Sequence, residues 1–162
     1  MWVAAANHNL IGVEIELSNT PGRELILKKQ LEHLKSQFDY IFIDCPPSLG
    51  VLTINALVAA DSILVPLQSE YYALEGISSL MQTIELAQES LNPELKVEGI
   101  LLTMFDSRTN LSRQVEQEAK SFFGSLVFDT VIPRNIRLSE SPSFGKPIFL
   151  YDPQSAGASA YM

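Results

Sequence analysis

Short apolar runs alternate along this chain with segments in which apolar residues recur at helical spacing. The runs cover residues 38–44, 61–66, 98–103 and 127–132. Runs that are apolar on both faces are typical of strands buried in a parallel sheet. The intervening segments predict four helices. They run from Thr20 to Gln37, from just after Gly50 through Ala59, from Glu75 to Leu91, and from a cap at Asn110 to Gly124. Alternating strands and helices predict an α/β fold with a parallel, doubly wound sheet in one domain.

The first run ends in a carboxylate, Asp44, and two prolines follow after Cys45. Asp44 would lie at the carboxyl end of its strand, where ligands bind in open α/β sheets. Because proline cannot donate to a sheet ladder, Pro46 and Pro47 would turn the chain out of the sheet. The pattern is that of a Walker B strand, whose aspartate holds Mg²⁺ through water beside a nucleotide. The pattern alone fits a purely structural strand equally well.

The other three runs also end in polar segments, at Pro66–Glu70, Thr103–Asp106 and Pro133–Asn135. The second and fourth of the runs are expected to end at Pro66 and Pro133. In a parallel sheet the carboxyl ends of the strands share one edge, so all four segments would line one crevice. A common ligand explains them better than four coincidences, which favours a nucleotide.

Composition narrows the picture. The chain is 46% hydrophobic and 19% charged, with no apolar run near the roughly 20 residues that cross a bilayer and no secretory signal. Its single cysteine, Cys45, fits a reducing cytoplasm and is expected to be a buried structural thiol. The net charge of −8 lies in residues 1–103, whereas residues 104–162 balance 6 basic against 6 acidic side chains. That balance argues against indiscriminate polyanion binding but leaves a local basic patch open.

Several long segments carry a resemblance to a known family. FDYIFIDCPPSLG, LTINAL, EYYALEG, GILLTMFD, VIPRNIRLSESPSFGKPI and YDP resemble the ParA/Soj chromosome- and plasmid-partitioning ATPases, a deviant Walker A branch of the P-loop NTPases. The resemblance implies a P-loop NTPase-type, Rossmann-like, mostly parallel sheet flanked by helices, within a single partial domain over 1–162. It also implies ATP and Mg²⁺, an ATP-dependent homodimer, nonspecific DNA, a ParB-like centromere-binding partner, no membrane, and a bacterial, nucleoid-associated cytoplasmic location.

The resemblance assigns roles residue by residue. The Walker B aspartate, catalytic and holding Mg²⁺ through water, is Asp44, and the switch segment after it is Pro46, Pro47 and Ser48. The adenine would be held by Thr103, Pro133, Arg134 and Asn135. The dimer interface would include Glu70, Tyr71, Tyr72 and Glu75. The DNA-binding residues would be Arg108 and Arg137, ahead of Arg134, Arg113 and Lys146.

One part of the family pattern is missing from this sequence. A P-loop needs a glycine-rich turn with a lysine, and no glycine here has a Gly-Lys-Ser/Thr neighbour. We therefore expect a fragment truncated at both ends, which alone neither hydrolyses ATP nor folds as a compact monomer, because residues 38–44 would lack both neighbouring strands. Two alternatives are a non-catalytic binding module and a fragment of a MinD-like positioning ATPase.

Overall fold

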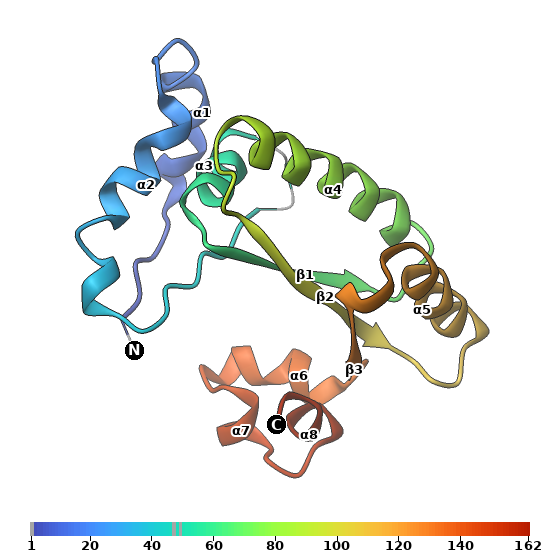
Figure 1. The fold of residues 1–162 in the computed structure, drawn as a ribbon. Coiled ribbons are helices and arrows are strands. Elements are labelled where there is room, and N and C mark those ends of the chain that lie inside the picture. Colours follow the sequence, from blue (N-terminus) through green and yellow to red (C-terminus); the bar gives the residue numbers. More distant parts are fainter. Residues whose placement is uncertain (1, 47, 49) are drawn as a thin grey trace. The chain divides into compact units, whose positions relative to one another are not determined.

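The computed structural model describes residues 2–46, 48 and 50–162, without the side chains of Ile11 and Glu14 (Figure 1). The chain forms two compact units. The first comprises Met1–Asp61 and Leu80–Lys96, and the second comprises Ser62–Ser79 and Val97–Met162. A single domain over the whole chain stays a prediction.

A three-stranded sheet forms the core of the second unit. Its strands are β1 (Ser62–Gln68), β2 (Lys96–Phe105) and β3 (Val127–Pro133), in the order β1-β2-β3. β2 pairs with β3 in parallel, with Ile100 opposite Val127. Ile100 and Leu102 of the central strand are fully buried, at 0% exposure. The predicted α/β fold with a parallel sheet flanked by helices is confirmed.

Two details of this sheet depend on proline and glycine. β1 was expected to end at Pro66 but continues to Gln68. Pro66 is exposed on a strand with one described neighbour, so its missing N–H costs no ladder bond. In β2, a Cβ added to Gly99 would lie 2.5 Å from the ring of Phe128. Glycine therefore allows β3 to pack its aromatic ring directly on the β2 backbone.

Along the chain, each strand of this unit is followed by a helix (Figure 1). α5 (Asn110–Phe123) is capped by Thr109, whose side chain accepts a hydrogen bond from the N–H of Ser112, so the predicted cap at Asn110 is one residue late. The helix ends at Gly124, which has a positive φ of 56°. After β3 the chain forms the short helices α6 (Ile136–Glu140), 3-10 Ser141–Phe144, α7 (Ile148–Tyr151) and α8 (Ala156–Tyr161).

The first unit is helical where it is regular. Its elements are 3-10 His8–Gly12, α1 (Val13–Glu16), 3-10 Arg23–Leu25, α2 (Ile26–Leu31), 3-10 Lys35–Gln37, α3 (Val51–Ala59) and the second part of α4 (Ala73–Ser90). Asn55 of α3 ties α2 in place, because its amide donates to Arg23 O and its Oδ1 accepts from Leu27 N at 3.0 Å. The predicted single helix from Thr20 to Gln37 is wrong. Gly22 has a left-handed φ of 70°, which interrupts its start.

The predicted strand over Phe38–Asp44 is also wrong, because residues 38–46 form no strand. A strand exists only through ladder bonds to a neighbour, and the described part of the first unit contains no other strand. Tyr40 and Phe42 are 80% and 91% exposed and stack on each other with ring centroids 6.1 Å apart. Cys45 is exposed rather than buried, because the segment that carries it forms no strand and is not part of the sheet.

No helix within the described residues combines the length and the apolar character that crossing a bilayer requires.

Candidate functional site

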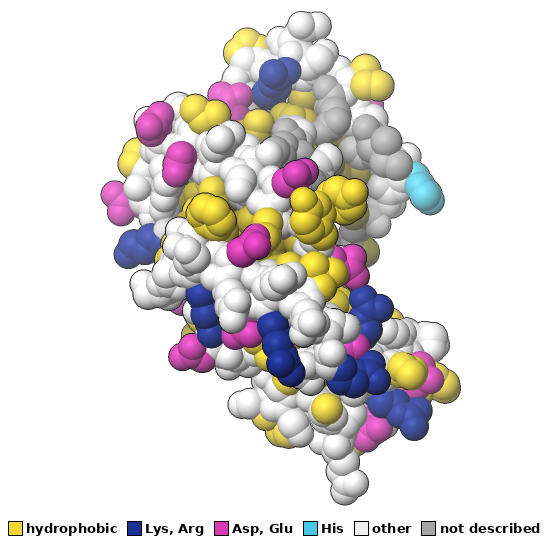
Figure 2. Space-filling model, turned by 90° about the vertical axis from the view of Figure 1, so that its right-hand side faces the viewer, with side chains coloured by type: hydrophobic (Ala, Val, Ile, Leu, Met, Phe, Trp, Pro, Cys, Tyr) yellow, Lys and Arg dark blue, Asp and Glu magenta, His cyan; other side chains and the backbone are white. Residues whose placement is uncertain are grey.

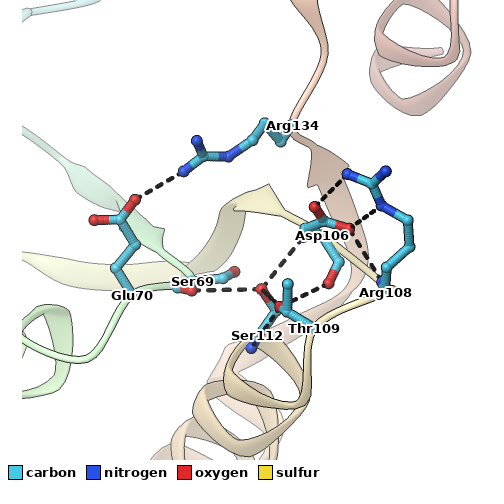
Figure 3. A network of polar contacts seen from close by, with 7 residues as sticks. All are labelled: Ser69, Glu70, Asp106, Arg108, Thr109, Ser112 and Arg134. Carbon is cyan, nitrogen blue, oxygen red and sulfur yellow. Dashed lines mark hydrogen bonds and ion pairs between the residues drawn. The ribbon is translucent and has the colours of Figure 1, made fainter.

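The carboxyl ends of the three strands are tied together by backbone hydrogen bonds. The N–H of Ser69, just after β1, donates to the carbonyl of Thr103 in β2 at 3.0 Å. The N–H of Arg134, just after β3, donates to the carbonyl of Phe105 at 2.9 Å. Three of the four predicted polar segments therefore meet at one edge of the sheet, as expected (Figure 3). The fourth, at Asp44, belongs to the other unit.

A salt bridge connects the outer strands at this edge. Nη2 of Arg134 lies 2.9 Å from Oε1 of Glu70, and each side chain is 54% exposed. Exposed pairs of this kind contribute about 0–1 kcal/mol. The contact nevertheless joins Arg134, which was predicted to hold adenine, to Glu70, which was predicted to lie in the dimer interface. The sequence did not indicate this pairing.

A buried hydroxyl organises the loop that follows β2. Ser112 is 3% exposed, and its Oγ accepts from the N–H of Asp106 at 3.3 Å and contacts the carbonyl of Ser69 at 3.5 Å. The hydroxyl of Thr109 contacts both Asp106 O and Ser112 Oγ at 3.0 Å. Met104 lies just before this loop with a positive φ of 53°, rare for a residue with a side chain. Sequence reasoning missed Ser112, and the only local signal near it is the threonine three residues earlier, a residue type preferred at the start of a helix.

Arg108 is held against Asp106 by a bidentate salt bridge (Figure 3). Its Nε lies 2.9 Å from Oδ1 and its Nη2 lies 2.8 Å from Oδ2, and its backbone N–H also donates to Oδ1 at 3.1 Å. These bonds lower the pKa of the Asp106 carboxyl to about 2 and raise that of Arg108. The Arg108 side chain remains 86% exposed. Asp106 was not among the predicted site residues.

Arg137 has two carboxylate partners. Its Nη1 lies 2.9 Å from Oε2 of Glu140, and its Nε lies 3.4 Å from Oδ2 of Asp152. The bonds from Arg137 and from the hydroxyl of Tyr151 lower the pKa of Glu140. A further cation, Arg113, donates to the carbonyl of Ser107 at 2.8 Å. Figure 2 shows Lys and Arg side chains gathered on one face, with Asp and Glu side chains between them.

The predicted adenine residues lie on the strands and on the segment after β3. The hydroxyl of Thr103 points back toward the carbonyl of Leu67 at 3.4 Å, and Pro133 ends β3 opposite Phe105. Asn135 caps α6 by accepting from the N–H of Arg137 at 2.9 Å. This cap links the adenine candidate to Arg137, a DNA-binding candidate. Their contact with a nucleotide stays a prediction.

The other predicted site residues occupy exposed positions. Asp44 and Pro46 lie in a segment of the first unit that forms neither helix nor strand, and Pro47 lies outside the described residues. Beyond it, Thr53 Oγ1 of α3 donates to the carbonyl of Ser48. No group of three or more acidic, His or Cys side chains within the described residues could hold a metal ion, so Asp44 stands as one carboxylate. Among the predicted interface residues, Tyr71 and Tyr72 are 66% and 78% exposed. Glu75 lies in the first turn of α4.

The fold defines the class of protein, which is that of the P-loop NTPases. A model of the AAA domain family matches residues 1–97. The crystal structure of cobyrinic acid a,c-diamide synthase from Mycobacterium smegmatis with bound ADP and magnesium matches with a TM-score of 0.79 and 41% identity. That match covers 96% of this chain and 56% of the synthase.

Two curated relatives narrow the family. The chromosome partitioning protein ParA of Myxococcus xanthus is 58% identical over 162 residues, which are 100% of this chain and 57% of that protein. The sporulation initiation inhibitor protein Soj of Bacillus subtilis is 59% identical over 160 residues, 99% of this chain and 63% of that protein. The chain belongs to the AAA domain family and is homologous to the ParA/Soj partitioning proteins. It spans 57% and 63% of the length of these two relatives.

Proposed function

We propose that this chain carries part of an ATP-dependent DNA-partitioning protein, which dimerises with ATP, binds DNA without sequence preference and acts with a ParB-like partner. The observation that carries the proposal is the identity of 58% and 59% with two partitioning-family proteins over nearly the whole chain. The edge where β1, β2 and β3 end supplies the residues through which the chain would act.

The nucleotide is Mg-ATP, whose γ-phosphoryl group would be the one cleaved. Its adenine would be held by residues that offer backbone polar groups and flat faces at the edge of the sheet, namely Thr103, Pro133, Arg134 and Asn135. The exposed Asp44 would accept hydrogen bonds from water on Mg²⁺, with Pro46, Pro47 and Ser48 as the switch segment after it. The similar synthase of Mycobacterium smegmatis, whose crystal structure contains bound ADP and magnesium, supports this choice.

The fit is incomplete at the phosphates. The sequence has no glycine-rich turn with lysine, so its own residues offer no cradle for the β- and γ-phosphates. We therefore infer that these 162 residues do not hydrolyse ATP by themselves. Hydrolysis would require phosphate-binding residues in addition to those of this sequence.

DNA would bind through Arg108 and Arg137. Arg108 is 86% exposed and Arg137 is 53% exposed, and both belong to the second unit. A planar guanidinium matches phosphate oxygens without reading bases, which suits binding that ignores sequence. Glu70, Tyr71 and Glu75 would lie at the interface of the dimer.

A chimera tests this function. In it, the 162 residues replace the matched region of Bacillus subtilis Soj, which is 63% of that protein. We expect the chimera to hydrolyse Mg-ATP and to bind duplex DNA, while the 162-residue chain alone does not hydrolyse ATP. A chimera with native circular dichroism that binds neither ATP nor DNA would contradict the proposal. Hydrolysis by the chain alone would contradict the inference about the phosphates.

A second candidate is a binding module without catalysis, favoured by the missing lysine-bearing turn. Such a module would bind duplex DNA or Soj subunits in the absence of ATP. Sedimentation of the 162-residue chain with each, with and without Mg-ATP, separates the two functions, because the partitioning ATPase requires nucleotide for both interactions.

A further inference from the structure

The two arginines proposed to bind DNA both carry carboxylate partners. Asp106 occupies the Nε and Nη2 donors of Arg108, at 2.9 and 2.8 Å. Glu140 occupies Nη1 of Arg137 at 2.9 Å, and Asp152 lies 3.4 Å from its Nε. Part of the donor set of each guanidinium is therefore already engaged by carboxylates of the same chain.

We propose that Asp106 and Glu140 are internal competitors of DNA phosphate, which lower the affinity of the arginine surface for DNA. The inference rests on the proposed DNA-binding function and adds residues that set its strength. A carboxylate and a phosphate present similar pairs of oxygens to the fork of a guanidinium. DNA must therefore displace the carboxylate or share the remaining N–H groups.

Asp106 is suited to compete because its backbone is fixed while Arg108 extends into solvent. The N–H of Asp106 is held by the buried Ser112, and its carbonyl is held by the hydroxyl of Thr109 at 3.0 Å. The carboxylate therefore cannot move away together with the loop when a phosphate approaches. Its low pKa, about 2, keeps it charged throughout the physiological range.

Charge balance supports the same inference. Residues 104–162 carry 6 basic and 6 acidic side chains, so this part of the chain has no net attraction for a polyanion. Asp106, Glu140 and Asp152 are three of those six acidic residues, and they lie directly on the two arginines. Neutralising one of them restores a net positive charge at the place where DNA would bind.

The test measures DNA affinity and its salt dependence by fluorescence anisotropy, with a duplex of arbitrary sequence and Mg-ATP. The chimera is used, and the full 162-residue chain is titrated in parallel. We expect Asp106→Asn and Glu140→Gln each to tighten binding by about 3-fold or more and to steepen the salt dependence by up to about one counterion. Asparagine keeps an oxygen to accept from the N–H of Arg108, so the loop is preserved.

Asp129→Asn is the matched control. It removes the same charge from the same unit, but Asp129 is fully exposed and lies 3.9 Å from Lys120 rather than on either arginine. If Asp106→Asn and Glu140→Gln tighten DNA binding no more than Asp129→Asn does, the inference is overturned, because the change in net charge alone would explain the gain in affinity. Weaker binding by Asp106→Asn would also overturn it, since Asp106 would then position Arg108 for DNA. If Asp106→Asn does not fold, Glu140→Gln decides by the same comparison.

Arg108→Ala separates this inference from the function on which it rests. Unchanged DNA binding in that variant would refute the proposed role of Arg108 in DNA binding itself. Weaker binding in Arg108→Ala, with no gain in Asp106→Asn beyond the control, would refute only the competition. The double variant Asp106→Asn/Arg108→Ala should lose the gain, because the freed donor is absent.

Discussion

Nη2 of Arg134 lies 2.9 Å from Oε1 of Glu70, a residue 64 positions earlier in the chain. The pair joins the segment after β3 to the segment after β1 across the carboxyl edge of the sheet. A residue proposed to hold adenine therefore contacts one proposed to lie in the dimer interface. This contact offers a direct route by which nucleotide binding would affect dimerisation.

Breaking the pair should affect assembly more than stability. In the chimera, Glu70→Gln is expected to change the free energy of unfolding by less than about 1 kcal/mol, because both side chains are half exposed. ATP-dependent dimerisation, measured by light scattering, should weaken. Glu118→Gln, an exposed carboxylate on α5, is the control. Equal dimerisation in both variants would remove the proposed link between Glu70 and the interface.

Gly99→Ala should destabilise the 162-residue chain by about 1–3 kcal/mol, because the new methyl group would overlap the Phe128 ring. Gly76→Ala in α4 is the matched control, since an added Cβ there meets nothing within 4 Å. It should be neutral or stabilising through helix propensity. Chemical denaturation measures both, and Phe128→Leu should partly rescue Gly99→Ala. Equal stability of the two alanine variants would contradict the close packing of β2 and β3.

Asn55→Ala should cost about 2–4 kcal/mol, because three hydrogen bonds are lost, two that join α3 to the Arg23–Leu27 segment and one to the carbonyl of Val51 within α3. Asn55→Asp keeps an acceptor for the N–H of Leu27 but loses both donor bonds. Its amide exchange at Leu27, followed by NMR, should remain closer to that of the unsubstituted chain than the exchange in Asn55→Ala. Matching exchange rates in the two variants would show that the Oδ1 bond does not protect Leu27.

The Asp106 carboxyl should titrate near pH 2, below its ordinary value of 3.8. A pKa that is lower in the folded state means that the Arg108 bonds stabilise the fold above about pH 4 and lose this effect as the pH falls toward 2. Carboxyl ¹³C NMR measures the midpoint directly. Arg108→Ala should raise it toward 3.8, and an unchanged midpoint in that variant would contradict the assigned cause.

Phe42→Ser should be favourable in the 162-residue chain, where it reduces aggregation, and destabilising in the chimera. In the 162-residue chain Phe42 is 91% exposed in a segment without a strand partner, so its loss should reduce aggregation and leave unfolding nearly unchanged. In the chimera, where we propose that residues 38–44 gain strand partners, the same change should lower the melting temperature. Light scattering and thermal denaturation measure the two effects. An unchanged melting temperature in the chimera would contradict the pairing.

The pattern of apolar and polar residues predicted those strands and helices that are buried in the folded chain and, for the strands, paired with a neighbour. β2 and β3 were found from apolar runs because their residues are buried in the sheet, and α5 was found within one residue at its cap. Residues 38–44 carry the same kind of run, yet they form no strand, because hydrogen-bonding partners cannot be read from an apolar pattern.

The sequence by itself determined the family and the α/β fold, since both follow from residue types and their order. It also predicted that four strand ends meet at one edge, which holds for three of them and fails for the end at Asp44. Only the tertiary structure revealed the pairing of Arg134 with Glu70 and of Arg137 with Asp152, and the burial of Ser112 beneath the loop. These contacts join side chains from different elements. Which side chains meet depends on how the backbone brings the elements together, and residue spacing along the chain does not predict this arrangement.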